Sequence, residues 1–176
     1  CQLVSLQAPH VDVFLIETMS NITEAKAALA AVKKTAVPGY VGLTITDNGM
    51  NTLRSGETLE QAIEQLLPVG PAGLMINCSM PETVSAAMGQ LKDLPIPFGG
   101  YANGFTSIDA LRPGGTVASL SARSDLSPDA YADFACSWID TGARIIGGCC
   151  EVGPAHIAYL AKRLQQDGHH LTGLSV

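Results

Sequence analysis

Residues 142–161 read GARIIGGCCEVGPAHIAYLA, and this stretch combines a buried strand with the start of a helix. The run at residues 143–150 is almost continuously apolar rather than alternating, which is typical of a strand covered on both faces of a parallel sheet. Gly153 and Pro154 occupy positions where helices begin, and Gly168 indicates where this helix ends. The stretch is therefore interpreted as one strand followed by one helix.

The same pattern occurs four more times earlier in the chain. Apolar runs at residues 11–18, 40–47, 72–79 and 96–103 alternate with helix-start signals. These signals are capping boxes at residues 21–24 and 58–61, Pro81, and Ser127 followed by Pro128. The first helix is expected to continue to about residue 35. Five strand–helix units predict an α/β fold with a parallel sheet, with a long loop at residues 104–125 that includes a short helix at residues 108–111.

The length and the charge of the chain limit the classes of protein to which it can belong. The chain has 176 residues, a formal net charge of −6 and 47% hydrophobic residues. These values indicate one compact domain over residues 1–176 and argue against disorder. The acidic balance gives no reason to expect nucleic acid or an anionic membrane as a partner. No apolar run reaches the roughly 18 residues that span a bilayer and no secretory leader is visible, so a cytoplasmic location is expected.

Polar and sulfur-containing residues gather at the carboxyl ends of the predicted strands: Glu17, Asp47, Asn77, Cys78, Asn103, Cys149 and Cys150. In a parallel sheet these ends converge on one side, where active sites form. Thiolates at the three cysteines would make a soft ligand set, for which Zn²⁺ is the commonest metal. Gly147 and Gly148 are expected to give the backbone the freedom that two adjacent ligands need.

Two other interpretations of these cysteines are open at this point. Buried cysteines can act as small hydrophobic residues, and Cys149 with Cys150 could form a vicinal redox pair. The chain has five cysteines, an odd number that makes a poor disulfide framework. Cys136 lies on the apolar face of a predicted helix and is assigned to the core.

The sequence GGCC at residues 147–150, with INCS at residues 76–79 and FLIETMSNITEAKAAL at residues 14–29, closely resembles the homocysteine S-methyltransferase family. The resemblance runs from about residue 9 to residue 165. It implies a (β/α)₈ TIM barrel that holds Zn²⁺ on Cys78, Cys149 and Cys150, with Glu17 binding the amino group of homocysteine. The implied activity is methyl transfer from a sulfonium donor, S-methylmethionine or S-adenosylmethionine, to the homocysteine thiolate, which gives methionine.

The resemblance leaves an alternative function and several residue roles open. The chain could be a non-catalytic or cobalamin-partnered module that binds homocysteine and zinc, and it could form a homo-oligomer. Asn77 and Asn103 are expected either to bind the substrate or to anchor the metal-binding loops, and Asn103 is grouped with Glu17 as a catalytic candidate. His156 is expected either beside a cysteine ligand or at the surface.

Several features depart from the family pattern. The chain contains five strand–helix units where a full barrel has eight, and they match strands four to eight. The domain at residues 1–176 is therefore expected to be N-terminally incomplete, or to be completed by a second chain. Residues 101–104 read YANG, where the family usually has Tyr-Pro-Asn-Ser/Ala-Gly. The long C-terminal extension of the betaine-dependent branch is missing, which favours a sulfonium donor.

Overall fold

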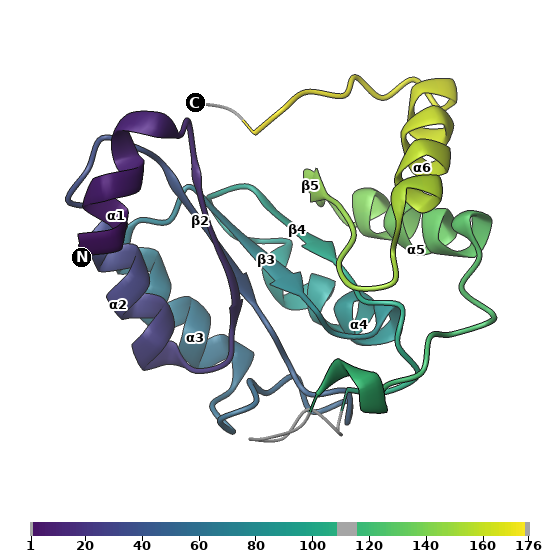
Figure 1. The fold of residues 1–176 in the computed structure, drawn as a ribbon, viewed down its shortest axis with the longest axis horizontal. Helices are drawn as coiled ribbons and strands as arrows, with labels where there is room; N and C mark the ends of the chain where they lie inside the picture. The colour runs from purple at the N-terminus through teal and green to yellow at the C-terminus, as the bar shows by residue number, and fades with distance from the viewer. Residues whose placement is uncertain (1, 109–115, 175–176) are drawn as a thin grey trace.

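The computed structural model describes residues 2–108 and 116–174. A parallel sheet forms its centre, with strands β1 (Phe14–Met19), β2 (Gly39–Leu43), β3 (Gly73–Asn77), β4 (Phe98–Tyr101) and β5 (Ile145–Ile146). The strands lie in the order β1-β2-β3-β4-β5 (Figure 1). The predicted parallel α/β architecture is confirmed. The strands are shorter than the apolar runs. In the last four runs the final residues leave the sheet and form loops at its carboxyl edge, whereas β1 omits the first residues of its run and continues to Met19.

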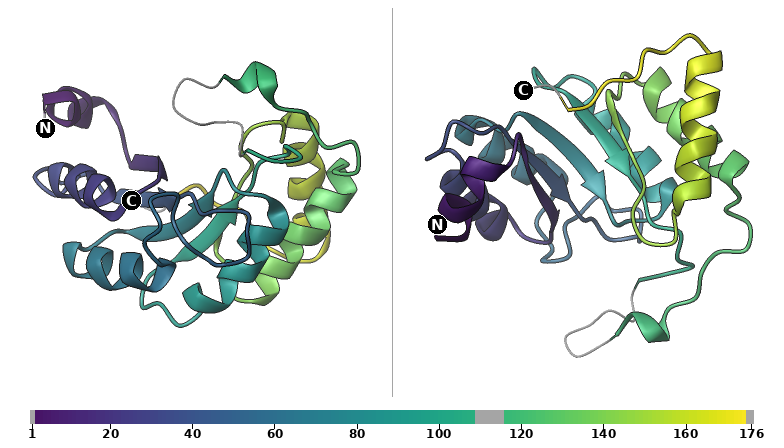
Figure 2. Two further views of the ribbon diagram at one scale, coloured as in Figure 1. Left: turned by 90° about the horizontal axis from the view of Figure 1, so that it is seen from below. Right: turned by 45° about the horizontal axis from the view of Figure 1, so that its top comes forward.

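Helices cover one face of this sheet. They are α2 (Ile22–Val32), α3 (Leu59–Leu66), α4 (Pro81–Leu91), α5 (Pro128–Asp140) and α6 (Pro154–Gln166). Seen from below, they form an arc along one side of the strands (Figure 2, left). Leu29 of α2 and Trp138 of α5 belong to the same buried cluster as Ile76 of β3. This layer of helices against strands is the main core of the molecule.

The opposite face of the sheet is the inner face of the arc. Its buried cluster is small and consists of Tyr40, Met75 and Tyr101. Leu15 of the edge strand β1 stays 43% exposed. Within the described residues, β1 and β5 each pair with a single neighbouring strand. The sheet is therefore an open arc with the architecture of part of a (β/α) barrel.

The first residues of the helices show how the local sequence determines where each helix begins after a strand. Thr58 forms the predicted capping box: its hydroxyl accepts the Gln61 N–H at 3.1 Å, and the Gln61 side chain accepts the Thr58 N–H at 2.9 Å. Asn21 caps α2 by accepting the Glu24 N–H at 2.8 Å. A full capping box would also have the Glu24 carboxylate accept the Asn21 backbone N–H. Instead, this carboxylate accepts a bond from the Asn21 side-chain amide, so the second bond of the box differs from the prediction.

Other local predictions also need correction. Helix α2 ends at Val32 rather than near residue 35, because Lys33 is its C-cap and the Thr35 hydroxyl donates to the Val32 carbonyl. A short N-terminal helix, α1 (Gln2–Gln7), was not predicted; it has only 6 residues and buries none of them. In the predicted short helix at residues 108–111, Ile108 is not helical, and residues 109–111 lie outside the described residues.

Gly99 provides a test of how β5 is held in the sheet. A Cβ added there would overlap the Ile145 carbonyl oxygen, so Gly99→Ala must push β5 away from β4. We expect the free energy of unfolding in urea to fall by about 2 kcal/mol or more. The matched control is Gly89→Ala in α4, where the added Cβ meets nothing within 4 Å. That substitution should stabilise by roughly 0.5–1 kcal/mol. Equal effects of the two substitutions would contradict this account of the β4–β5 contact.

Candidate metal centre

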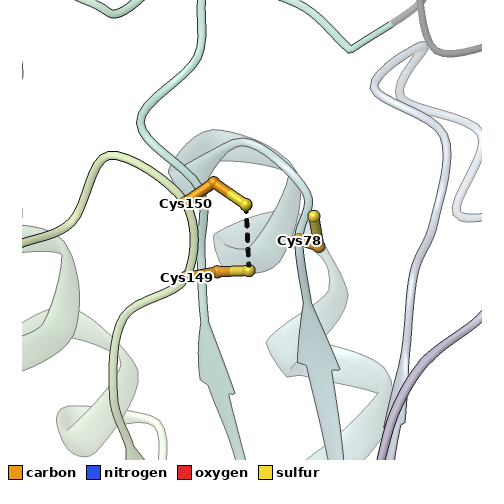
Figure 3. Close-up of side chains that lie close together, drawn as sticks. All are labelled: Cys78, Cys149 and Cys150. Atoms are coloured by element: carbon orange, nitrogen blue, oxygen red, sulfur yellow. Dashed lines mark hydrogen bonds between the residues drawn. The ribbon is translucent and has the colours of Figure 1, made fainter. Parts of the chain in front are cut away.

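Three cysteine sulfurs come together at the carboxyl edge of the sheet. Cys78 directly follows β3, and Cys149 and Cys150 lie in the loop after β5 (Figure 3). The three Sγ atoms all lie within 4.8 Å of one another, and those of Cys149 and Cys150 are 3.7 Å apart. Zinc–sulfur bonds of about 2.3 Å in a tetrahedron place two sulfurs about 3.8 Å apart. The donor type and the spacing therefore fit one tetrahedral Zn²⁺ with a fourth position free.

Backbone hydrogen bonds from β4 and its loop hold both cysteine segments. The Cys78 N–H donates to the Tyr101 carbonyl at 3.2 Å, and the Cys149 N–H donates to the Ala102 carbonyl at 2.9 Å. The Gly104 N–H then donates to the Cys150 carbonyl at 2.8 Å. Strand β4 lies between β3 and β5, so its carboxyl end reaches both segments.

The turn into the cysteine pair differs from the prediction. Neither Gly147 nor Gly148 has a positive φ, whereas Glu151, directly after the cysteine pair, has a φ of 63°. Gly148 is required for space instead, because a Cβ there would overlap Val152 Cγ1. Cys78 also has a positive φ, 51°. A non-glycine residue in this region is uncommon and, where it persists, the surrounding structure holds it there.

The electrostatics of the cluster favour a cation. A hydrogen bond with Cys149 is the main factor that lowers the pKa of Cys78, and the positive charge of Arg54 adds to it. The hydrogen bond with Cys78 raises the pKa of Cys149, and burial raises the pKa of Cys150. Close thiols cannot all ionise alone, because their negative charges repel. A soft divalent cation relieves that repulsion, and its binding releases the thiol protons.

Glu17 lies on β1, at the same edge of the sheet, with an exposed side chain. Burial is the largest factor that raises the pKa of Tyr101, and the negative charges of Glu17, Cys149 and Cys78 raise it further. The Glu17 carboxylate and the sulfur cluster are therefore both near Tyr101. Its hydroxyl is buried and has no hydrogen-bond partner among the described residues. A Cβ at Gly42 would lie 2.5 Å from this hydroxyl, so glycine at that position makes room for it.

Asn77 anchors the chain beside Glu17. Its side chain is fully buried; Oδ1 accepts the Thr18 N–H at 3.0 Å, and Nδ2 donates to Thr18 Oγ1 at 2.8 Å. Thr18 has a positive φ of 58°, which these bonds help to hold. The geometry favours loop anchoring, one of the two roles expected for Asn77. Asn103 is also buried, and its Oδ1 accepts the Phe105 N–H at 3.0 Å, while Nδ2 has no partner in the described chain.

Some residues at the site were not found by sequence reasoning. The Tyr131 hydroxyl donates to the Gly147 carbonyl at 2.7 Å and accepts the Ala102 N–H at 3.1 Å, which ties the ends of β4 and β5 together. Thr44 Oγ1 donates to the Cys78 carbonyl at 3.3 Å and accepts Arg54 Nε at 3.1 Å. Tyr131 lies on the apolar face of a helix, so its sequence context indicates core packing and gives no signal of this role.

His156 also has a different environment from the two that were expected. Its Nε2 contacts the Leu126 carbonyl at 3.0 Å, and its ring packs edge-to-face on Tyr131. Cys136, which was assigned to the core, is partly buried and packs against the main cluster. The four described cysteines are all free thiols.

Comparison with known proteins identifies the family of this chain. Residues 1–164 match the family model described as homocysteine S-methyltransferase. The chain belongs to the homocysteine S-methyltransferase family. It is 25% identical over 172 residues to homocysteine S-methyltransferase 2 of Arabidopsis thaliana, covering 93% of this chain and 48% of the relative. It is 26% identical over 163 residues to homocysteine S-methyltransferase 1 of the same plant, covering 88% and 47%.

Solved structures of the family agree with the fold. The metallated form of the homocysteine methyltransferase MmuM from Escherichia coli matches with a TM-score of 0.68 at 25% identity, covering 92% of this chain and 48% of that one. Its oxidized form gives a TM-score of 0.69, with 92% and 49% covered. The chain thus spans about half the length of the relatives that it matches. Within the described residues, every helix is too short or too polar to cross a membrane.

Asn77→Ala tests the anchoring of the site. The substitution removes both bonds to Thr18 and leaves the Thr18 N–H without its partner, so we expect the free energy of unfolding to fall by about 2–3 kcal/mol. Asn48→Ala is the control, because exposed Asn48 also accepts bonds with its side chain, and water can replace them; it should cost less than about 1 kcal/mol. Urea unfolding measures both, and a similar loss for the two variants would argue against an anchoring role for Asn77.

Proposed function

We propose that this chain provides the zinc- and homocysteine-binding part of a homocysteine S-methyltransferase. The reaction would transfer a methyl group from a sulfonium donor, S-methylmethionine or S-adenosylmethionine, to homocysteine thiolate, and give methionine. The observation that carries the proposal is the convergence of the sulfurs of Cys78, Cys149 and Cys150 within 4.8 Å of one another. Family membership supports homocysteine as the methyl acceptor.

The proposed roles follow from the chemistry of the donor set. The three cysteines would hold Zn²⁺ and leave a fourth position for the thiol of homocysteine. A bound Zn²⁺ supplies the positive charge that keeps this thiol deprotonated at neutral pH, where a free thiol of pKa about 8.5 is mostly protonated. The backbone hydrogen bonds with Ala102 and Gly104 orient the cysteines. The protein would therefore contribute to catalysis by positioning the reactants rather than by acid–base chemistry. A site that needs reduced thiols suits a reducing compartment such as the cytoplasm.

Glu17 and Tyr101 would hold the amino-acid end of homocysteine. The Glu17 carboxylate pairs with the substrate ammonium group, as the family resemblance implies. The buried Tyr101 hydroxyl lies beside that carboxylate and needs an acceptor, so it would donate to Glu17 and orient it. Asn103, with its unpartnered Nδ2, stays a candidate for contact with the substrate.

We also propose that residues 1–176 form the carboxyl-terminal five units of a (β/α)₈ barrel. The relatives are about twice as long as the matched region, and the inner face of the sheet is thinly covered. Further β/α units would pair with the free edges of β1 and β5 and would enclose the substrate on this face.

Metal content gives the first test. The protein should bind about one zinc per chain, and Cys78→Ala, Cys149→Ala and Cys150→Ala should each weaken zinc binding by more than about 100-fold. Cys136→Ala is the control, because Cys136 packs on the main core and lies outside the sulfur cluster. Chelator competition measures the affinity, and methionine formation from homocysteine measures activity. Wild-type zinc affinity in Cys149→Ala would rule out this ligand set.

The methyl donor separates the proposal from the alternative of a cobalamin-partnered or non-catalytic module. We expect the zinc-loaded protein to form methionine from homocysteine with S-methylmethionine or S-adenosylmethionine alone. Zinc and homocysteine binding without turnover until a methylcobalamin-carrying partner is added would favour the alternative.

Tyr101→Phe tests how the substrate amino group is recognised. Loss of the hydroxyl should free the Glu17 carboxylate and weaken homocysteine binding by about 10- to 100-fold, the value of a hydrogen bond to a charged group. Binding of 4-mercaptobutyrate, which has the thiol and the carboxylate but no amino group, should not change. In a protein that already carries Glu17→Gln, adding Tyr101→Phe should not weaken homocysteine binding any further. Calorimetric titration measures each affinity, and equal weakening of both ligands would show that Tyr101 does not act through Glu17.

A further inference from the structure

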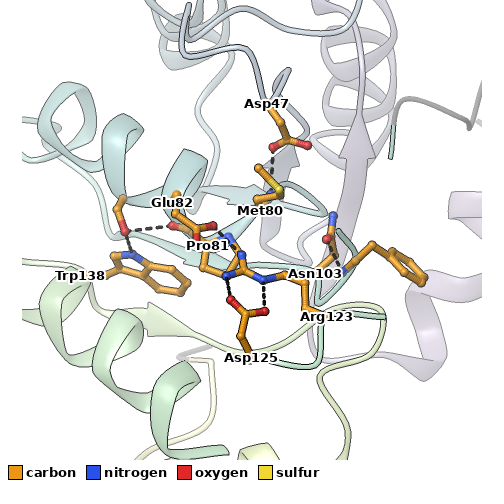
Figure 4. A network of polar contacts seen from close by, with 10 residues as sticks. Asp47, Met80, Pro81, Glu82, Asn103, Arg123, Asp125 and Trp138 are labelled. Carbon is orange, nitrogen blue, oxygen red and sulfur yellow. Dashed lines mark hydrogen bonds and ion pairs between the residues drawn. The ribbon is translucent and has the colours of Figure 1, made fainter. Parts of the chain in front are cut away.

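Arg123 is the centre of a network of ion pairs with Glu82 and Asp125 (Figure 4). Its Nη1 lies 2.8 Å from Glu82 Oε2, while Nε and Nη2 donate to the two Asp125 carboxylate oxygens at 3.1 and 2.9 Å. The Arg123 side chain is only 13% exposed. A guanidinium with two parallel bonds to one carboxylate and a third bond to another is held in one orientation.

The positive charge of Arg123 stabilises the ionised forms of the two carboxylates that it contacts. Hydrogen bonds from Arg123 hold the pKa of Asp125 below its usual value. Burial raises the pKa of Glu82, but the hydrogen bond from Arg123 and other bonds outweigh it, so the net pKa of Glu82 is lowered. Both carboxylates are therefore ionised at neutral pH, and the network persists over the range in which thiols bind metal.

The backbone of Arg123 connects to the Cys149–Cys150 loop. Its N–H donates to the Gly104 carbonyl at 2.8 Å, and the Gly104 N–H donates to the Cys150 carbonyl at 2.8 Å. Gly104 packs closely here, since a Cβ at this position would lie 3.0 Å from Glu151 Cβ. A displacement of Arg123 would therefore be passed to Cys150 through one intervening residue.

The side chain of Arg123 connects to the other cysteine segment. Glu82 lies in the first turn of α4, which begins directly after the loop that carries Cys78. The start of this helix is fixed from the other side as well, because Asp47 Oδ1 accepts the Met80 N–H at 2.9 Å (Figure 4). Arg123 thus has its backbone on the Cys150 side and its guanidinium on the Cys78 side.

We propose that Arg123 is a positioning residue of the metal centre. It holds the Cys78 segment and the Cys149–Cys150 segment at the separation that lets three sulfurs share one cation. This inference rests on the proposed zinc site but assigns a residue outside the cysteine ligands. Residues that orient metal ligands typically change metal affinity by about 10- to 100-fold when they are mutated.

Arg163 offers a matched control within the same chain. It also contacts several carboxylates, those of Asp129, Asp133 and Asp167, but its side chain is 36% exposed and lies on α6. None of these contacts involves a cysteine segment. Arg163→Ala removes an arginine with its ion pairs while the metal centre stays as it is.

The test compares zinc affinity and metal geometry in Arg123→Ala, Arg123→Lys and Arg163→Ala. Chelator competition gives the zinc affinity, and the d–d and thiolate-to-cobalt bands of the Co²⁺-loaded protein report the tetrahedral geometry. Arg123→Ala should weaken zinc binding by about 10- to 100-fold and alter the d–d bands. Arg123→Lys, which keeps the charge but not the paired bonds, should fall in between. Arg163→Ala should stay within about twofold of the wild type.

Several outcomes would overturn the inference. One is an Arg123→Ala protein with wild-type zinc affinity and an unchanged cobalt spectrum; another is an equal loss in Arg163→Ala, which would indicate general destabilisation. If Arg123→Ala does not fold, Glu82→Gln removes one contact of the same network and should weaken zinc binding in the same direction; an unchanged affinity in that variant also counts against the inference. A wild-type protein that binds no zinc would instead refute the proposed function, on which this inference depends.

Discussion

The repulsion between three close thiolates is the constraint on which this site depends. Sulfurs within 4.8 Å of one another cannot all carry a negative charge without a cation, so the pKa values of Cys149 and Cys150 are raised and the backbone has to bring the thiols together. The backbone does this with hydrogen bonds from β4 and its loop to both cysteine segments. The geometry of the sulfur cluster is therefore a property of the sheet order, in which β4 lies between β3 and β5.

That dependence explains why much of the site could be predicted from sequence. Once residues 72–79 and 143–150 are taken as parallel strands, their carboxyl ends must lie on one side of the sheet, and Cys78 is brought towards Cys149 and Cys150. The Thr58 capping box was also predicted correctly, because all its partners lie within one helical turn, whereas the box at Asn21 forms only in part. The fold class and the cysteine cluster both follow from short-range patterns combined with one rule of topology.

The rest of the site depends on contacts between residues far apart in the chain. Asn77 with Thr18, Tyr131 with Gly147, and Arg123 with Glu82 are pairs whose partners no periodicity or spacing identifies. The role of Gly148 was also predicted wrongly, although its contact with Val152 is local. Its sequence context indicates backbone freedom, whereas the structure needs it for space against Val152.

Two of these long-range contacts fix the edge strands of the sheet, β1 and β5. Strands β1 and β5 lack a neighbour on one side within the described residues, and edge strands are the least constrained part of a sheet. Each is fixed at its carboxyl end by a buried side chain from another element: Asn77 of β3 binds Thr18 of β1, and Tyr131 of α5 binds Gly147 just before the cysteine pair. The bonds lie beside Glu17 and the cysteine pair, so these proposed binding residues keep their relative positions even though the arc of strands is open.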